Sequence, residues 1–540
     1  MKRILSALIL FVAVLMLASC GRGNTEPSYS DENAADAYES RPYAETQDAE
    51  SLDAEAQVPE YPVDDPIADT TVVQPPTPTP LPELTTAHFL EDLDYMLYVL
   101  ENNFALFDVA YWARGVDIHA IVENVRAEIL ADPDMDVDGF YAALFWCFLP
   151  LVDIGHFWFI DPYAHYHILY GPEAWERWAL STSALARLRQ PHVLAFYEPR
   201  HPGAATNGNE SAWIEGFTAT LMNMTEQEIL LMYSWFIARA RFHGGDELAD
   251  SLLQSLLTTD IAEAIHLLDY ASEILANAPN VTTRIVKEGS IAYIAVDSFP
   301  RYVIHAAEQR YIYAFYEEIR YFDHLIIDLR LNGGGSPNWF YTGLMGPHIE
   351  RRITVDGFVF LAYGEYAAGY ANIQRGSFFN TASGISSADA QRSPIAEILE
   401  SNDLPELNVA DMERMDYGFR VRNGVNPTAG PSRRSNEIMF PGKIWFLTGP
   451  HMGSAAQISA WTAKESGFAT LVGEITGGNY GGPRTFVTLP NSGIAFQLDL
   501  FYVTDSRGRP LEAGTIPHIF NREGMDALET VLALIAEGEY

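Results

Sequence analysis

The stretch from residue 281 to 540 alternates short apolar runs with helical segments, and this alternation constrains the fold more than any other feature of the chain. Runs rich in β-branched and aromatic residues are typical of strands. They read "IAYIAVDSF", "HLIIDLR", "KIWFLTG", "ATLVGEIT", "TFVTLP" and "IAFQLDLFYVT". Helical periodicity lies between them, around residues 306–319 and 455–466. The pattern predicts an α/β core over residues 281–540, with functional sites at the carboxyl ends of its strands.

The stretch before this core has the spacing of amphipathic helices. In residues 85–160 the apolar side chains recur every three to four positions, as in Phe89, Leu93, Met96, Leu97 and Leu100. This spacing predicts an N-terminal helical domain. Residues 161–280 contain a second helical block and are expected to form a mostly helical insertion. Its Trp, Tyr and Met residues are interpreted as core side chains.

The first residues have the features of a secretory signal. A basic start, a short apolar run and small residues precede Cys20, which predicts a lipoprotein signal peptide over residues 1–19. The ending "LASC" resembles a bacterial lipobox, and this resemblance implies a lipid on Cys20. The chain would then be extracytoplasmic, anchored to a membrane of the bacterial cell envelope. An ordinary signal peptide is the alternative.

Residues 20–84 are acidic and rich in proline, with little apolar periodicity, and are predicted to be a disordered linker. Over the whole chain, 72 Asp and Glu stand against 33 Lys and Arg, which argues against nucleic-acid partners. Two cysteines give no disulfide framework. His165 and His167 would share one face of a strand, but no further ligand at a recognisable spacing accompanies them, so no metal site is predicted. No phosphate or dinucleotide fingerprint suggests a cofactor.

Two turns that follow strands could carry chemistry. In "LIIDLRLNGGGSP" the glycines allow peptide N–H groups of Gly334 or Gly335 to approach a ligand. In "HMGSAAQISAW" Ser454 would stand at a helix N-terminus, where N–H groups such as that of Ala455 stabilise negative charge. A serine there is either a nucleophile or a helix N-cap. Asp328 and Arg330 are expected to pair with each other or to brace the glycine turn.

The order of five blocks resembles the tail-specific, or C-terminal-processing, serine peptidases. The blocks are "GSIAYIAVDSF", "FDHLIIDLRLNGGG", "GKIWFLTGPHMGSAAQISAW", "ATLVGEITGG" and "GRPLEAGTIPHI". The resemblance covers residues 289–520 and extends more weakly to about residue 85. It implies a crotonase-like, Clp-protease-like core. These peptidases often carry a PDZ module, of which residues 159–280 give no evident sign.

The resemblance also implies roles for particular residues. Ser454 takes the place of the nucleophile, and Gln457 stands where the family usually has Glu. Asn479 occupies the place of the general-base Lys in one branch of the family, so a Ser-Lys dyad is not expected.

The other branch includes the tricorn protease and takes its base from a motif that "LVDIGHFWF" resembles in part, with an Ile between Asp153 and Gly155 and with Phe157 after the histidine. In that branch His156 would be the base and Glu512 would orient it.

Ser454, His156 and Glu512 would form a nucleophile, base and orienter, with the N–H groups of Ala455 and of Gly334 or Gly335 binding the oxyanion. The predicted function is a membrane-anchored serine endopeptidase that hydrolyses peptide or protein substrates through an acyl-enzyme. A degenerate binding protein on the same fold is the main alternative, and a crotonase-like acyl-CoA enzyme is a further one. The distance between the His156 ring and Ser454 separates these hypotheses.

Overall fold

The computed structural model describes residues 83–152, 154–170, 182–201, 226–257, 261–300, 306–361, 364, 366, 393–428, 438–478 and 484–539. All of these residues belong to one compact unit. Within this described part of the chain, no helix combines the length and the apolar character needed to cross a membrane.

A six-stranded sheet forms the centre of the α/β core, with strand order β13-β9-β8-β4-β3-β2. Neighbouring strands are parallel except β2 and β3, which are antiparallel. The strands are β2 (Val281–Lys287), β3 (Ile291–Val296), β4 (His324–Asp328), β8 (Lys443–Thr448), β9 (Thr470–Gly473) and β13 (Ile519–Phe520). The predicted α/β core is confirmed.

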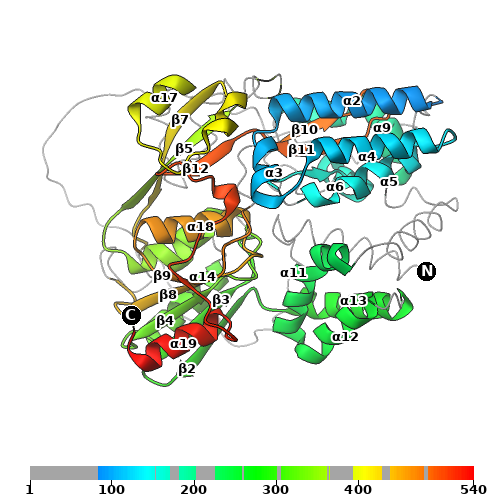
Figure 1. The fold of residues 1–540 in the computed structure, drawn as a ribbon. Coiled ribbons are helices and arrows are strands. Elements are labelled where there is room, and N and C mark those ends of the chain that lie inside the picture. Colours follow the sequence, from blue (N-terminus) through cyan, green and yellow to red (C-terminus); the bar gives the residue numbers. More distant parts are fainter. Residues whose placement is uncertain are drawn as a thin grey trace, which may run out of the picture. The chain divides into compact units, whose positions relative to one another are not determined.

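Helices cover both faces of this sheet, which is why β3 and β4 are buried at every position (Figure 1). Side chains on one face, such as Ile294 and Phe446, share a cluster with helices α14 and α18. Those on the other face, such as Tyr293 and Trp445, pack against α19. The covering helices are α14 (Ala306–Glu318), α15 (Pro337–Phe340), α18 (Ser454–Glu465) and α19 (Ala527–Glu537).

Two smaller sheets complete the strand content of the described residues. A four-stranded sheet has the order β12-β5-β7-β6, and a three-stranded sheet has the order β1-β11-β10. Their strands are β1 (Trp158–Phe159), β5 (Ile353–Leu361), β6 (Ser393–Pro394), β7 (Tyr417–Val425), β10 (Arg484–Thr488), β11 (Ala495–Asp499) and β12 (Tyr502–Asp505). The run "IAFQLDLFYVT" is therefore two strands in different sheets.

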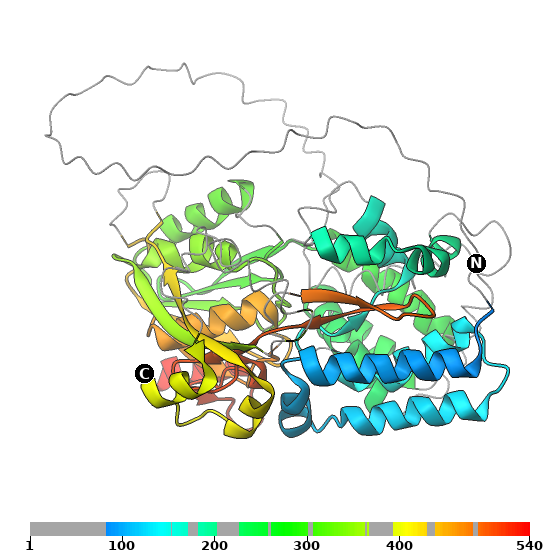
Figure 2. The same cartoon turned by 90° about the horizontal axis from the view of Figure 1, so that it is seen from above.

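The N-terminal part of the described chain is helical, as predicted. Its helices are α2 (Thr86–Asn103), α3 (Phe107–Arg114), α4 (Ile118–Ala131) and α5 (Val137–Cys147). The β10–β11 turn lies against α2 (Figure 2), where the Asp92 carboxylate accepts the N–H groups of Asn491 and Ser492, each at 2.8 Å. The helices and both smaller sheets share one hydrophobic cluster.

The segment that follows is also mostly helical where it is described. It contains α6 (Pro162–Tyr170), α8 (Thr182–Leu188), α9 (Pro191–Tyr197), α11 (Glu226–Gly244), α12 (Asp246–Leu257) and α13 (Ile261–Asn277). The expectation that His165 and His167 lie on a strand is wrong. Asp161 accepts the N–H of Ala164 at 2.9 Å and Pro162 follows it, so the chain begins helix α6 there.

Short helical turns and one further helix connect these elements. They are η1 (Leu149–Leu151), η2 (Glu198–Arg200), the π-helical η3 (Tyr341–Met345), η4 (Gly346–His348), α17 (Ile395–Ser401), η8 (Val409–Arg414) and η9 (Leu511–Ala513). Of these, η1 and η9 matter most for function, because η1 leads to the His156 turn and η9 contains Glu512.

Candidate active site

Ser454 lies where the chain passes from β8 into α18, at the first position of the helix. The N-cap of this helix is Gly453. Ser454 has a φ of 50°, the only positive value among the non-glycine residues that the structure describes. Such a conformation costs about 1–3 kcal/mol and is characteristic of functional turns. The N-cap interpretation of Ser454 is therefore wrong.

His156 lies beside this serine, although the two are far apart in the sequence. It follows η1 and precedes β1, and its Nε2 is 3.4 Å from the Ser454 Oγ. A catalytic hydrogen bond is often this long in the absence of substrate. The arrangement places an imidazole where it can accept the hydroxyl proton.

The carboxylate on the far side of the imidazole belongs to Asp499. The His156 Nδ1 lies 3.1 and 3.0 Å from its two oxygens, and the His156 backbone N–H donates to Oδ2 at 2.8 Å. Asp499 is fully buried at the end of β11. Because β1 pairs with β11, with Trp158 opposite Gln497, the register brings Asp499 beside His156. The carboxylate therefore fixes both the ring and the backbone of this histidine.

Glu512 was predicted to orient His156, and the geometry corrects this assignment. The Glu512 Oε1 instead accepts the backbone N–H of Gly155 at 3.0 Å. Gly155 has a φ of 58°, and a Cβ at this position would lie 2.6 Å from Asp499 Oδ2. Glu512 thus holds the turn, whereas Asp499 contacts the ring. One signal for Asp499 is present in the sequence, because it is a single carboxylate within the apolar run "AFQLDLFYV".

Gln457 is buried in the first turn of α18, where the family usually has Glu. Its Nε2 donates to the Leu511 carbonyl and to the Thr515 hydroxyl, each at 3.0 Å. Its Oε1 accepts the hydroxyl hydrogen of Thr476. An amide can donate and accept at the same time, so Gln457 ties the helix of the nucleophile to the loop that carries Glu512.

The glycine turn lies directly against the nucleophile. A Cβ on Gly334 would be 2.7 Å from the Ser454 Cβ and 2.9 Å from the Ala455 nitrogen, so only glycine allows this approach. Asn332, which is fully buried, organises the turn. Its Nδ2 donates to the Val296 carbonyl at 3.0 Å, and its Oδ1 accepts the Gly334 N–H at 2.8 Å.

One of the predicted oxyanion donors, the Gly334 N–H, is already bonded within the turn. It donates to Asn332. The Gly334 carbonyl accepts the N–H of Phe299 at 2.8 Å. In a trans peptide the next N–H points the opposite way, so the Gly335 N–H points away from Phe299. The Ala455 nitrogen lies close to Gly334, and the N–H groups of Gly335 and Ala455 remain the predicted oxyanion donors.

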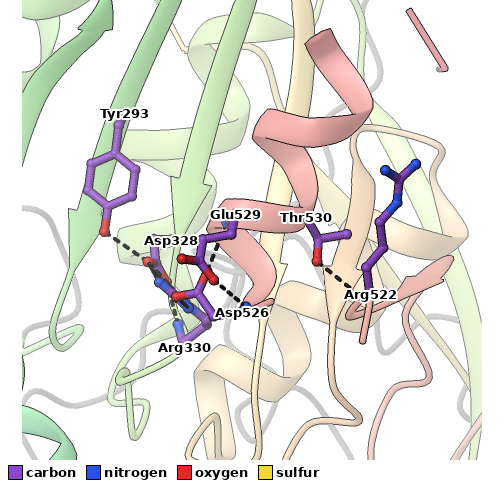
Figure 3. A network of polar contacts seen from close by, with 7 residues as sticks. All are labelled: Tyr293, Asp328, Arg330, Arg522, Asp526, Glu529 and Thr530. Atoms are coloured by element: carbon purple, nitrogen blue, oxygen red, sulfur yellow. Dashed lines mark hydrogen bonds and ion pairs between the residues drawn. The ribbon is translucent and has the colours of Figure 1, made fainter. Parts of the chain in front are cut away.

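Arg330 anchors the start of this turn, as Figure 3 shows. Its Nη2 donates to Asp328 at 2.8 Å and its Nη1 to Asp526 at 2.8 Å, which confirms the predicted pairing of Asp328 with Arg330. The Asp328 carboxylate also accepts the Tyr293 hydroxyl at 2.8 Å. Asp526 is the N-cap of α19, so the network links the end of β4 to that helix.

Burial and charge shift the pKa values of several groups around the turns. Burial opposes the charged form of Arg330, yet Asp328 and Asp526 raise its pKa above the usual value. Burial and the neighbouring Asp328 raise the pKa of Tyr293. Burial lowers the pKa of His451, three residues before Ser454. At neutral pH Arg330 is therefore charged, and Tyr293 and His451 are neutral.

Cys20, Asp153 and Asn479 lie outside the described part of the chain, as does the rest of the predicted signal peptide and linker over residues 1–82.

Part of the chain matches a known protein family. Residues 406–520 match the model of Peptidase family S41. No curated protein sequence matches the chain.

Solved structures of peptidases are similar at low identity. A putative peptidase from Parabacteroides merdae is 14% identical with a TM-score of 0.41, over 84% of this chain and 97% of that one. Mature CPAF complexed with lactacystin is 13% identical with a TM-score of 0.42, over 85% and 98%. The tricorn protease is 16% identical with a TM-score of 0.24, over 46% and 18%. Residues 406–520 are therefore similar to Peptidase family S41.

Proposed function

We propose that this chain is a serine endopeptidase that uses Ser454 as nucleophile, His156 as general base and Asp499 as orienting carboxylate. The observation that carries the proposal is the continuous line of contacts from the Ser454 Oγ through both ring nitrogens of His156 to the buried Asp499. A serine hydroxyl becomes a useful nucleophile only when a base takes its proton. The strained backbone of Ser454 supports the same assignment.

Acylation follows from this geometry. The Ser454 Oγ attacks the carbonyl carbon of the scissile peptide bond while its proton passes to His156 Nε2. The N–H groups of Ala455 and Gly335 stabilise the oxyanion, and each donor is worth about 3 kcal/mol in comparable sites. The imidazolium, balanced by Asp499, then gives its proton to the leaving nitrogen as the C–N bond breaks.

Deacylation repeats the same proton path with water. His156 takes a proton from a water molecule, and the resulting oxygen nucleophile attacks the acyl ester. The ester bond breaks, the proton returns to Ser454, and the new carboxyl end of the substrate leaves. The residues described supply every step, and the substrate is a peptide or a protein.

The first test is labelling of the native chain with a fluorophosphonate, which reacts with activated serines. We expect labelling of the native chain and its loss in Ser454→Ala and His156→Ala, with all three proteins shown to be folded. If the folded native chain takes no label, the proposal fails and the binding-protein alternative takes its place.

A second test separates the two carboxylates. Asp499→Asn should reduce the labelling rate by up to about 10⁴-fold, because the ring loses its anionic partner and its correct tautomer. Glu512→Gln still accepts the Gly155 N–H and should reduce the rate by less than about tenfold. Equal losses in the two variants would contradict the assignment of Asp499 as orienter.

We propose further that Cys20 carries a lipid and anchors the chain to a membrane of the bacterial cell envelope. Support comes from the signal-like residues 1–19 and the "LASC" sequence. We expect the native chain to incorporate a radiolabelled fatty acid and to fractionate with membranes. Cys20→Ser should abolish both, and a soluble native chain without label would refute the anchor.

A further inference from the structure

Helices α11, α12 and α13 form a group with a hydrophobic core of its own. The cluster draws all of its members from these three helices: Tyr233, Phe236, Ile237, Ala240, Leu248, Ala249, Leu252, Leu256, Ala271 and Leu275. Because the group buries its apolar side chains internally, its polar contacts with the α/β core are informative.

One stripe of α11 makes these contacts. Trp235, Arg239 and His243 are spaced four residues apart and so lie on one face of the helix. The Trp235 Nε1 donates to the Leu331 carbonyl at 3.1 Å. The Arg239 Nη2 and the His243 Nε2 each lie 2.6 Å from Asp297 Oδ2. The Arg239 guanidinium also lies 4.8 Å from the centre of the Trp235 ring.

Both anchoring points lead directly into the glycine turn. Leu331 precedes Asn332, the residue that organises the turn. Asp297 follows β3 and stands two residues before Phe299, which pairs with the turn on both sides. The Phe299 N–H donates to the Gly334 carbonyl, and the Phe299 carbonyl accepts the Ser336 N–H, each at 2.8 Å.

The backbone of Phe299 lies directly against Gly335. A Cβ on Gly335 would lie 2.0 Å from the Phe299 carbonyl oxygen. A shift of the segment from Asp297 to Phe299 therefore moves the Gly335 peptide as well. Oxyanion donors act at 2.7–3.1 Å, and displacements of about 1 Å cost large factors in rate.

We propose that Trp235 and Arg239 are positioning residues for the reaction, and that the α11–α13 group is a brace that holds the oxyanion turn in its active conformation. The inference rests on the proposed function, because it assigns a role to a turn of that active site. Neither residue touches the reacting atoms. Both act through the backbone on either side of Gly334 and Gly335.

The ion pair between Arg239 and Asp297 is buried. The Arg239 and Asp297 side chains are 9% and 7% exposed. Burial raises the pKa of Asp297, but the hydrogen bond from His243 and the charge of Arg239 outweigh it, so the pKa is lowered overall. Removing Arg239 leaves the buried Asp297 carboxylate without the charge of its guanidinium partner. A buried charge that loses its partner is strongly destabilising.

The test uses the full-length chain in detergent and two variants of the brace. Trp235→Phe keeps an aromatic ring and removes only the N–H donor. Arg239→Met keeps the aliphatic length and removes the charge. Arg241→Met is the matched control, because Arg241 is on the same helix but is 45% exposed and pairs with the exposed Asp246 and Asp250.

Two quantities are measured for each protein. Hydrogen exchange of the amides in residues 331–336 reports on the turn, and saturation kinetics of fluorophosphonate labelling separate the maximal inactivation rate from the inhibitor binding constant. We expect both brace variants to speed exchange and to lower the maximal rate about tenfold with binding unchanged. Arg241→Met should match the native chain in both measurements.

The outcomes distinguish this inference from the proposed function. Unchanged exchange in both brace variants overturns it, and so does faster exchange with an unchanged inactivation rate. If Arg239→Met does not fold, Trp235→Phe decides alone. A native chain that takes no label refutes the proposed function, whereas the exchange comparison still decides whether α11 holds the turn.

Discussion

Gly155 meets two separate requirements at the residue before the proposed base. Its φ of 58° lies in the left-handed region, and a Cβ there would meet Asp499 Oδ2 at 2.6 Å and Leu106 Cδ1 at 2.9 Å. Its N–H also donates to Glu512. A single position therefore sets the backbone of His156 and leaves space for the carboxylate that fixes its ring.

The two requirements can be separated by two alanine substitutions. Gly155→Ala should lower the free energy of unfolding by about 1–3 kcal/mol and the labelling rate by at least about a hundredfold, because the methyl group displaces Asp499. Gly115 has a φ of 71° with nothing within 4 Å of a Cβ. Gly115→Ala should cost only about 1 kcal/mol of backbone strain and leave labelling unchanged. Chemical unfolding and labelling kinetics check both, and equal labelling of the two variants would contradict the steric argument.

At the scale of elements, α19 is joined to the glycine turn by one carboxylate with two tasks. Asp526 Oδ1 accepts the Glu529 N–H at 2.8 Å, while its Oδ2 accepts from Arg330 at 2.8 Å. Glu529 in turn accepts the Asp526 N–H at 2.9 Å, which completes a capping box. Figure 3 shows Asp526 between Arg330 and Glu529.

Asp526→Asn removes the ion pair with Arg330 but keeps the N-cap of α19, because Asn caps helices as well as Asp does. Asp526→Asn should lower the free energy of unfolding by at most about 1 kcal/mol, since the Asp526 side chain is 51% exposed and Arg330 keeps Asp328. Asp526→Ala also removes the N-cap, so its free energy of unfolding should be about 1 kcal/mol lower than that of Asp526→Asn. Denaturant unfolding of both variants measures the difference, and identical values would show that the cap contributes nothing.

The same scale shows what the sequence could predict. Ser454 and His156 are found through short stretches of sequence that resemble motifs of the tail-specific peptidases. Asp499 is not, because its contact with His156 spans 343 residues and depends on the register of β1 on β11. Periodicity identifies strands, but it does not show that "IAFQLDLFYVT" changes sheets between β11 and β12.

At the scale of the whole molecule, buried histidines in separate parts of the chain make stability depend on pH. His165 in α6 and His201 after η2 lie 3.0 Å apart, and burial lowers their pKa values to about 3 and about 4. His348 ends η4 among the rings of Tyr316, Phe440 and Phe468. Within the described residues its ring nitrogens have no hydrogen-bond partner, and burial lowers its pKa to about 3.

The sign of the effect follows from the proton balance. Above the unfolded pKa of about 6.5 these histidines are neutral in both states. Between about 6.5 and the folded values of 3 to 4, the unfolded chain binds protons that the folded chain does not, so stability falls as the pH falls. Asp161 acts in the opposite direction, because burial raises its pKa to about 6 and the folded state takes up its proton first.

His348→Phe isolates one of these contributions, since phenylalanine suits an aromatic cage and does not titrate. Between pH 7 and pH 5 the native chain should lose about 2 kcal/mol through His348, at about 1.4 kcal/mol per pH unit below 6.5. The variant should lose correspondingly less. Urea unfolding at both pH values measures the difference, with the exposed His266→Phe as control. If the two variants share the pH dependence of the native chain, His348 is not held neutral, and the acid sensitivity of the fold has another origin.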